Sequence, residues 1–300
     1  MAAPGAVVVR ATPSATGAPT DPQAIDYGQA VPLRCLYTDL DGTLLGQFGS
    51  LFRDAEGNFS RAQALTFEAC HRAGVEVVIM SGRREAQIQA DARLFGQSSY
   101  IYEAGCGMVI DGERTYLTGS WVPDEAGTPA ERIIEAGLPD LLFERFGGRL
   151  EYHAPWHQDR VLSLLFRGKV DSGEVNALIA EAGHEDLRFL DNGAINRPMA
   201  GIDRAHAYHL VPGGASKGKA VGAHMGARGY APDECIAAGD SIEDLGAAEF
   251  VGRFFCVANG PEKDPPLREA MAAFDNVTVT EGRMGDGVYE AVVSTLAGAA

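Results

Sequence analysis

Short apolar runs alternate with amphipathic stretches from about residue 33 onward. The run at 75–80 is almost entirely apolar, which is typical of a strand buried on both faces of a sheet. The amphipathic stretches have helical spacing: one begins at a capping-box pair, Ser60 and Gln63, and ends at Gly74, and the next ends at Gly96. The pattern predicts strands at 33–38, 75–80 and 100–102, with helices at 60–74 and 85–95. It favours a parallel sheet covered by helices.

The rhythm of the pattern changes over residues 115–208. This region has helical patterns at 129–136, 139–146 and 175–182 and strand patterns at 161–166 and 187–190, with polar loops between them. The sheet pattern then returns, with a helix from Ser216 to Gly229 and strands at 236–238, 254–257 and 277–280. We therefore predict an α/β core formed by residues 31–114 and 209–300, and a separate α/β insert at 115–208. Residues 1–30 are rich in Ala, Pro, Thr and Gly and predict a disordered tail rather than a signal peptide.

Composition limits the classes of partner. The chain has 300 residues and a formal net charge of −16, which argues against nucleic acid as a partner. No apolar run approaches the ~20 residues that a membrane-spanning helix needs, so we expect no membrane association. The five cysteines are odd in number and scattered, which predicts reduced structural thiols and a cytoplasmic location. Nothing in the sequence predicts the oligomeric state.

The strand at 33–38 leads into two carboxylates and a flexible turn. Asp39 and Asp41 are two positions apart, so an extended backbone would direct both side chains to the same side. They would lie at the carboxyl end of the strand, where open α/β sheets bind ligands. Two neighbouring acids suit a division of labour between a nucleophile or metal ligand and a proton carrier. Gly42 lets the backbone approach an anion closely, and Thr43 adds a hydroxyl.

Other predicted strands also end in chemically competent residues. The strand at 75–80 is followed by Ser81, Gly82 and Arg83. The strand at 236–238 is followed by Asp240 and, about one helical turn later, by Asp244. Together with Asp39, these carboxylates form an oxygen-rich set that suits Mg²⁺. Lys217 follows a plausible N-cap, Ser216, and would lie at the positive end of a helix, where anions bind.

With these motifs in place, the chain resembles the haloacid dehalogenase superfamily. It is most similar to the Cof-like sugar-phosphatase branch, which carries a large cap between its second and third motifs. The resemblance spans about residues 33–297 and rests on four segments, 39–43, 81–83, 216–218 and 239–244, with 257–260 and 285–288 also similar. It implies a Rossmann-like parallel sheet core with an inserted α/β cap domain.

The resemblance also implies a role for each motif. Asp39 would be the nucleophile that forms an aspartyl-phosphate, and Asp41 would be the acid and base. Mg²⁺ would be held by the Asp39 carboxylate, the Asp41 backbone carbonyl and Asp240, with Asp244 as a ligand or just outside the ligand set. Lys217 would pair with Asp39 and the transferring group. Phosphoryl and substrate contacts would come from Gly42, Thr43, Ser81, Gly82 and Arg83.

These roles predict a Mg²⁺-dependent phosphatase acting on a small phosphorylated metabolite, either a sugar phosphate or a phosphorylated glycoside. The alternative is a phosphohexomutase, because phosphomannomutases have similar core motifs and cap placement. Its cap would need several arginines around a second phosphate, for which Arg160, Arg188, Arg197 and Arg204 are available. A phospho-accepting receiver domain would leave Asp41 and the insert without a role.

One further pattern is a near match to a nucleotide-binding P-loop. Residues 213–220 fit G-x-x-x-x-G-K followed by Ala220, where the P-loop needs the hydroxyl of Ser or Thr. In that interpretation Lys219, not Lys217, would contact phosphate. Glu103 and Glu243 and the long 46–59 segment also depart from the resemblance, and they leave the substrate open.

Overall fold

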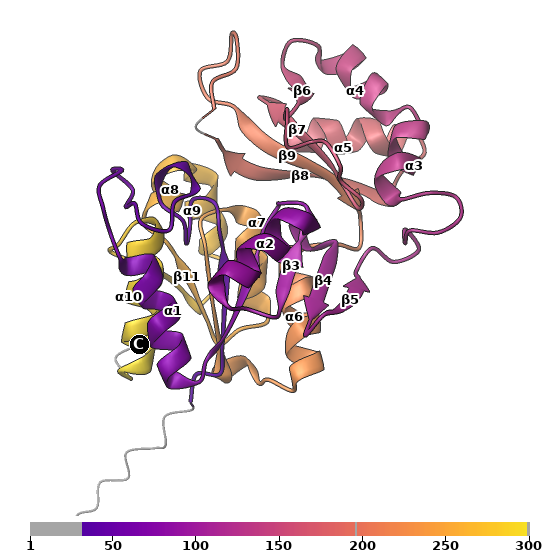
Figure 1. Ribbon diagram of the computed structural model, residues 1–300. Helices are drawn as coiled ribbons and strands as arrows, with labels where there is room; N and C mark the ends of the chain where they lie inside the picture. Colours follow the sequence, from indigo (N-terminus) through magenta and orange to yellow (C-terminus); the bar gives the residue numbers. More distant parts are fainter. Residues whose placement is uncertain (1–31, 196, 299–300) are drawn as a thin grey trace, which may run out of the picture. The chain divides into compact units, whose positions relative to one another are not determined.

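The computed structural model describes residues 32–195 and 197–298 (Figure 1). The predicted disordered tail at 1–30 and Asn196 lie outside the described residues. Within the described part, the chain forms one eight-stranded sheet and one four-stranded sheet, with helices packed against both. The α/β class with a mainly parallel sheet is confirmed.

The large sheet has the strand order β12-β11-β10-β1-β2-β3-β4-β5. The first six strands in that order are parallel to one another, and β4 and β5 continue the sheet in antiparallel fashion. The strands are β1 Cys35–Asp39, β2 Glu76–Met80, β3 Tyr100–Tyr102, β4 Gly107–Ile110, β5 Glu113–Tyr116, β10 Cys235–Gly239, β11 Arg253–Cys256 and β12 Val277–Val279.

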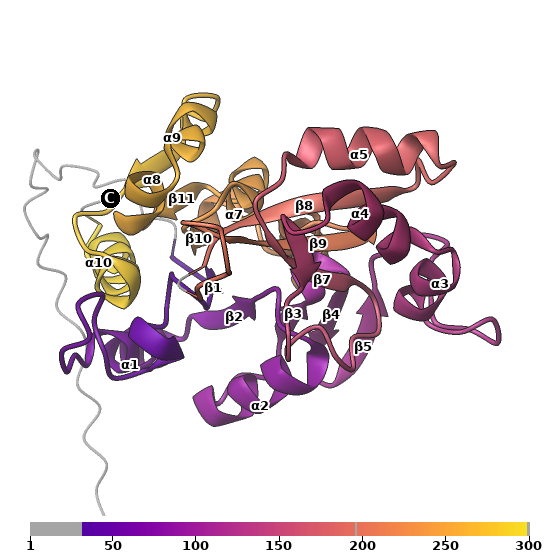
Figure 2. The ribbon, with the colours of Figure 1, turned by 90° about the horizontal axis from the view of Figure 1, so that it is seen from above.

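Helices cover both faces of the large sheet. On β1, Leu36 packs with helices α1, α2 and α10, whereas Tyr37 packs with α6, α7 and α9 on the opposite face. Both faces are therefore buried, which explains why the central strands read as continuous apolar runs. Figures 1 and 2 show α1 and α10 side by side. These helices are α1 Ala62–Ala73, α2 Glu85–Phe95, α6 Lys217–Arg228, α7 Ile242–Leu245, α8 Asn259–Lys263, α9 Pro265–Met271 and α10 Met284–Leu296.

The second sheet is antiparallel, with the strand order β6-β7-β9-β8. Helices α3, α4 and α5 pack on one of its faces around Phe146, Phe166 and Phe189. The elements are α3 Pro129–Glu135, α4 Leu138–Phe146, β6 Leu150–Tyr152, β7 Leu164–Gly168, α5 Ser172–Glu181, β8 Leu187–Ala194 and β9 His206–Pro212.

The predicted limits of the insert, 115 and 208, differ from the limits of this sheet. Position 115 falls inside β5, which belongs to the large sheet, and position 208 falls inside β9, which belongs to the second sheet. Strand β9 pairs with both β7 and β8, so its place depends on partners distant in sequence. The second sheet with its helices accordingly occupies the region between β5 and Gly213.

Two predicted elements begin later than expected. The strand predicted at 161–166 begins at Leu164, because the backbone N–H groups of Val161 and Leu162 donate to the Glu103 carboxylate instead of to a strand. The helix predicted from Ser60 begins at Ala62. Its capping box does not form, since the Gln63 side chain donates to the carbonyl of Arg53 in the preceding loop.

A glycine lets the turn after β3 approach the start of α6. Gly105 has φ +87°, and a Cβ there would lie 2.2 Å from the carbonyl carbon of Ser216. Gly112 has a similar φ of +90°, but a Cβ there would meet nothing within 4 Å. Substitution at Gly112 therefore tests the cost of a left-handed backbone alone, whereas substitution at Gly105 adds the cost of steric overlap.

We predict that Gly112→Ala lowers the free energy of unfolding by roughly 1–2 kcal/mol, the cost of a left-handed backbone. Gly105→Ala should cost roughly 1–3 kcal/mol more, because the added methyl overlaps backbone that cannot easily move. Urea denaturation of both variants and the wild type measures the difference. Equal losses would show that the turn and the helix start are not held this closely.

Candidate active site

Four parallel strands bring polar residues to one edge of the large sheet. Asp39 is the last residue of β1, Ser81 follows β2, Asp240 follows β10 and Asn259 lies shortly after β11. Strands β11, β10, β1 and β2 are consecutive neighbours, so their carboxyl ends are adjacent. The structure therefore gathers residues that are as much as 220 positions apart, from Asp39 to Asn259.

A buried ion cluster lies at this edge. The Nζ atom of Lys217 donates to Asp39 Oδ1 and to Asp244 Oδ1, each at 2.7 Å. Lys217 and Asp244 are each 1% exposed, and Asp39 is 5% exposed. Burial alone would lower the pKa of Lys217, but the charges of Asp244 and Asp39 outweigh it and hold that pKa above its usual range. The ammonium group therefore stays charged between the two carboxylates.

Asp240 completes a set of three carboxylates. One oxygen from each of Asp39, Asp240 and Asp244 lies within 4.8 Å of the others. Burial, and then the charge of Asp244, raises the pKa of Asp240 to about 6. Burial likewise raises the pKa of Asp39, and Lys217 offsets part of that shift.

The donor set fits a hard divalent cation. Three carboxylates and the one ammonium of Lys217 leave two negative charges, reduced by Lys263 at 3.8 Å from Asp240. Carboxylate oxygens are the ligands that Mg²⁺ takes in proteins.

The loops around this cluster are fixed by specific contacts. Gly42 has φ +94°, and a Cβ there would lie 2.5 Å from Asp240 Oδ2, so a side chain would obstruct the site. The Thr43 hydroxyl donates to Asp240 Oδ1 at 3.3 Å. The Asn259 amide donates to the Gly42 carbonyl at 2.8 Å, and its oxygen accepts from the Met284 N–H. Thr43 and Asn259 thus tie the first loop to the loops after β10 and β11.

Asp244 holds the start of α7. Its Oδ2 accepts hydrogen bonds from the backbone of Asp240 and Ser241 and from the Ser241 hydroxyl, while its Oδ1 accepts from Lys217. Four donors therefore occupy this carboxylate, which leaves Asp39 and Asp240 as the more available oxygen ligands.

Asp41 lies apart from the three-carboxylate set. Its side chain is about half exposed, and both carboxylate oxygens accept from Arg83, at 2.6 and 2.7 Å. Arg83 also donates to Asp91 at 2.6 Å. The substrate contact predicted for Arg83 stays a prediction, and in the structure Arg83 is paired with Asp41.

Ser81 and Gly82 lie beside the second sheet. Ser81 is buried, and its hydroxyl accepts from the Arg83 N–H. A Cβ on Gly82 would lie 2.6 Å from Nε2 of His209, in β9, and 3.6 Å from Nδ2 of Asn192, in β8. A side chain at position 82 would therefore force the His209 imidazole to move.

Sequence reasoning assigned no role to a second buried ion pair. The Glu103 carboxylate accepts from the Ser163 hydroxyl and from the backbone N–H groups that precede it. The Arg160 guanidinium lies 3.7 Å from Glu103 and donates to the Gly82 carbonyl at 2.9 Å. No sequence signal joins these residues. Asn259 was also given no role, although its position after a predicted strand offered the same signal that located Asp240.

Comparison with known proteins shows which proteins the chain resembles. No family model matches the chain. A phosphoglycolate phosphatase from Methanospirillum hungatei is 29% identical over 234 residues, covering 77% of this chain and 86% of that protein. The chloroplastic endoribonuclease YBEY of Arabidopsis thaliana is 26% identical over 288 residues, which is 85% of this chain but only 46% of that longer protein.

Solved structures share the fold. A haloacid dehalogenase-like hydrolase from Bacteroides thetaiotaomicron aligns with a TM-score of 0.57 at 16% identity, covering 87% of this chain and 98% of that one. The sucrose-phosphatase of Synechocystis, solved with sucrose and phosphate, aligns with a TM-score of 0.61 at 14% identity, covering 87% and 97%. The chain is thus similar in sequence to phosphoglycolate phosphatases and shares its fold with haloacid dehalogenase-like hydrolases. The predicted resemblance to the haloacid dehalogenase superfamily and the predicted reaction class, a phosphoric monoester hydrolase, are confirmed.

The two lysines at the start of α6 have different environments. Lys217 is buried in the ion cluster, whereas Lys219 is exposed and its backbone N–H donates to Ser216 as part of the helix cap. The P-loop interpretation required the reverse arrangement. The geometry therefore favours Lys217 as the functional residue.

We predict that Lys217→Ala lowers turnover of a generic phosphate ester by at least about 100-fold, because it removes preorganised charge from the reacting centre. Lys219→Ala should leave turnover unchanged. Steady-state rates, with circular dichroism to confirm folding, measure both. Loss of activity in the Lys219 variant alone would favour the P-loop interpretation instead.

Proposed function

We propose that this protein is a Mg²⁺-dependent phosphatase that hydrolyses a small phosphorylated metabolite through an aspartyl-phosphate on Asp39. The observation that carries the proposal is the buried contact of Lys217 with Asp39, beside Asp240. Phosphoryl transfer depends mainly on positioning and on neutralising the charge of the transferred group, and this cluster supplies both.

Asp39 has one oxygen available for attack. Lys217 binds Oδ1, and no hydrogen bond within the described residues engages Oδ2. In the first step Oδ2 would form a bond to phosphorus as the bond from phosphorus to the substrate alcohol breaks. Asp41 would give its proton to the departing oxygen. It would then take a proton from the water that attacks phosphorus, which releases phosphate and restores the Asp39 carboxylate.

The metal would be held by the Asp39 and Asp240 carboxylates and by the backbone carbonyl of Asp41. Asp244 would act mainly through Lys217 and the backbone that it binds. When bound, Mg²⁺ supplies positive charge to the phosphoryl oxygens.

The remaining predicted site residues have supporting roles. The Ser81 hydroxyl and the backbone of Gly42 and Thr43 would bind phosphoryl oxygens. The Thr43 side chain is already engaged with Asp240, so its hydroxyl supports the metal ligand rather than the substrate. Arg83 would hold Asp41 in position for proton transfer.

Hydrolysis is favoured over the mutase alternative by the contacts of the arginines in the 115–208 region. Arg160 is buried against Glu103, Arg188 donates to the Ala215 carbonyl and Arg197 lies over the Trp156 ring. These three side chains have separate partners and do not form a common clamp for a second phosphate.

The second sheet would serve as the cap that selects the substrate. Asn192 and His209 approach the loop after β2, where the leaving group of a bound ester would lie. Amide and imidazole groups suit a polyhydroxylated leaving group, so we propose a sugar phosphate or a phosphorylated glycoside. The phosphoglycolate phosphatase relatives make phosphoglycolate the natural competitor in a substrate test.

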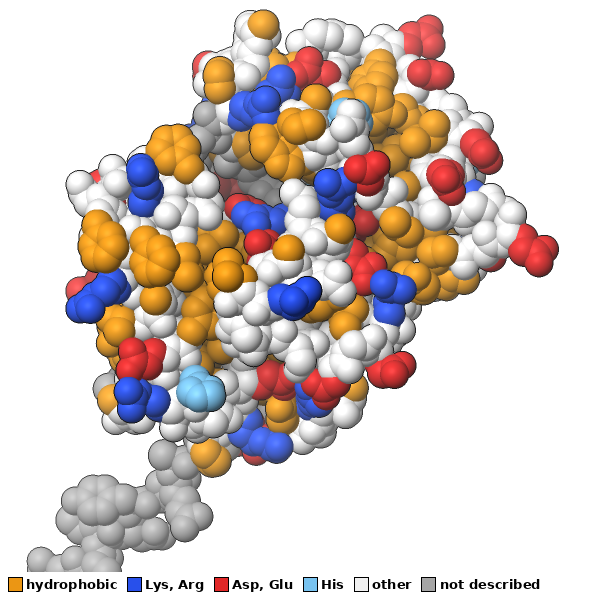
Figure 3. All heavy atoms as spheres, in the orientation of Figure 1, with side chains coloured by type: hydrophobic (Ala, Val, Ile, Leu, Met, Phe, Trp, Pro, Cys, Tyr) orange, Lys and Arg blue, Asp and Glu red, His pale blue; other side chains and the backbone are white. Residues whose placement is uncertain are grey.

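We also propose a cytoplasmic location and no nucleic-acid or membrane partner. The five cysteines are free and buried, which suits a reducing compartment. On the face shown in Figure 3, basic and acidic side chains are interspersed without a continuous basic area. No helix in the described ranges is long and apolar enough to cross a membrane.

We predict that Asp39→Asn abolishes turnover by several orders of magnitude while the fold survives, because the amide keeps the size of the side chain but is a poor nucleophile. Asp203→Asn, the same change at an exposed carboxylate, should have no effect. Rates with a generic phosphate ester and Mg²⁺ measure both. A folded Asp39→Asn variant that kept a tenth of the activity would disprove the covalent mechanism.

A panel of phosphate esters tests the substrate. We expect the highest kcat/KM for a sugar phosphate or phosphorylated glycoside, with 2-phosphoglycolate and nucleoside monophosphates turned over less efficiently. Chelation of Mg²⁺ should abolish turnover of every ester, and added Mg²⁺ should restore it. A clear preference for phosphoglycolate or for a nucleotide would overturn the substrate assignment and leave the mechanism intact.

A further inference from the structure

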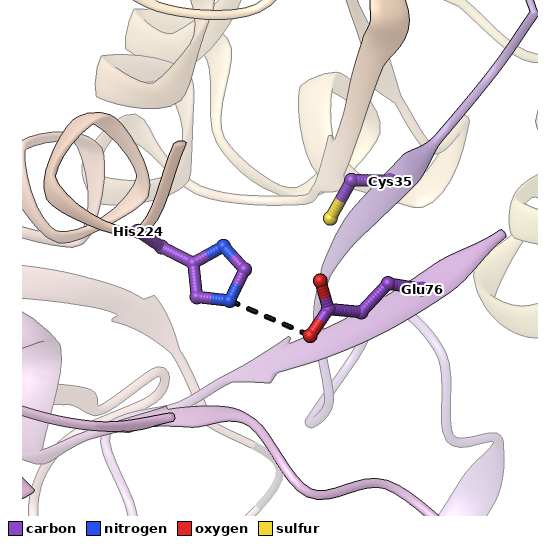
Figure 4. A group of neighbouring side chains, drawn as sticks. All are labelled: Cys35, Glu76 and His224. Atoms are coloured by element: carbon purple, nitrogen blue, oxygen red, sulfur yellow. Dashed lines mark ion pairs between the residues drawn. The ribbon is translucent and has the colours of Figure 1, made fainter. Parts of the chain in front are cut away.

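A second group of possible ligands lies at the amino ends of the central strands, whereas the candidate active site lies at their carboxyl ends. Cys35 and Glu76 are the first residues of β1 and β2, and His224 projects toward them from α6 (Figure 4). One ligand atom from each lies within 4.8 Å of the others. Cys35 is four residues before Asp39, or about 13 Å along an extended strand, so this group is separate from the active site.

His224 has an unsatisfied nitrogen directed into this group. The side chain is fully buried, and its Nδ1 lies 2.8 Å from the Tyr37 hydroxyl. Its Nε2 has no hydrogen-bond partner among residues 32–195 and 197–298, and the nearest Glu76 oxygen is 3.6 Å away. A buried polar atom without a partner is costly. An imidazole that hydrogen-bonds an oxygen through one nitrogen and leaves the other free has the arrangement of a metal ligand.

Glu76 is held in place by three donors. Its Oε1 accepts from Ser99 at 2.8 Å and from Arg228 at 2.9 Å, and its Oε2 accepts from Tyr230 at 2.8 Å. A carboxylate has about four lone-pair sites, so about one remains for a further partner. Burial raises the pKa of Glu76, but these hydrogen bonds and His224 outweigh it and lower that pKa to about 2.

A second thiol adjoins the first. Cys235 is the register partner of Cys35 in the parallel pair of β1 and β10, so the two side chains share one face of the sheet. Both are buried. Two thiolates and the Glu76 carboxylate would together balance the charges of a divalent cation and of the Arg228 guanidinium.

We propose that Cys35, Glu76 and His224, with Cys235 as the fourth ligand, bind a structural zinc ion. Thiolate and imidazole donors favour Zn²⁺ over Mg²⁺, and a set of four protein ligands is typical of structural rather than catalytic zinc. The ion would join the starts of β1, β2 and β10 to α6, the helix whose first residue is Lys217. It would thereby fix the helix that presents the buried lysine to the active site.

The test uses the full chain, expressed with zinc and purified without chelator. Metal analysis of the denatured protein should find one zinc per chain in the wild type and in Asp240→Asn, which alters only the catalytic edge. Cys35→Ser and His224→Gln should retain little zinc. Cys70→Ser, a change at a buried free cysteine outside the group, should retain all of it.

Cobalt gives an independent readout. Protein refolded with Co²⁺ should show a thiolate-to-cobalt charge-transfer band in the wild type and in Asp240→Asn. Tyr37→Phe should weaken cobalt binding by roughly 10–100-fold, the usual effect of removing a partner of a ligating histidine. This variant keeps all four ligands, so it tests the proposal even if Cys35→Ser does not fold.

Three results would overturn the proposal. The first is a wild-type protein with no zinc and no cobalt band. The second is unchanged zinc content in Cys35→Ser. The third is a thiol titration of the denatured, unreduced protein that finds two fewer thiols than the five cysteines, which would show a disulfide instead.

Discussion

The active-site edge is organised around the ammonium group of Lys217, buried between Asp39 and Asp244. Taking one cation and two anions out of water costs several kcal/mol per ion, and only close contacts and further hydrogen bonds recover that cost. Removing one partner of such a buried pair typically costs about 3–5 kcal/mol, because it leaves an uncompensated charge. These contacts therefore hold the end of β1 and the starts of α6 and α7 in a fixed relative position.

Neighbouring features follow from that geometry. Gly105 and Gly218 let backbone approach α6 closely: a Cβ at either position would lie within 2.3 Å of a backbone atom of Ser216 or Gly246. Gly42 brings the first loop against the Asp240 side chain. A side chain at any of these three positions would overlap atoms beside the ion cluster. The ion cluster and the close backbone contacts at these glycines thus favour the same placement of the first loop, α6 and α7.

Much of this edge could be predicted from the sequence, because strand ends in a parallel sheet converge. That rule placed Asp39, Ser81 and Asp240 at one edge, and the helix-start rule placed Lys217 near an anion site. The rule says nothing about which distant side chains pair. Sequence patterns therefore missed the contact of Arg83 with Asp41 and that of Arg160 with Glu103. The predicted limits of the insert fall inside β5 and β9, and the place of β9 is defined by its pairing with β7 and β8 rather than by its own pattern.

The central claim is that Asp39 carries the phosphoryl group during turnover. Acid-quenched reactions of the Asp41→Asn variant, which lacks the base for the second step, test it most directly when digested and examined by mass spectrometry. We predict a phosphoryl group on the peptide that contains Asp39, removed by hydroxylamine as expected of an acyl phosphate. A phosphoryl group on any other residue would contradict the account.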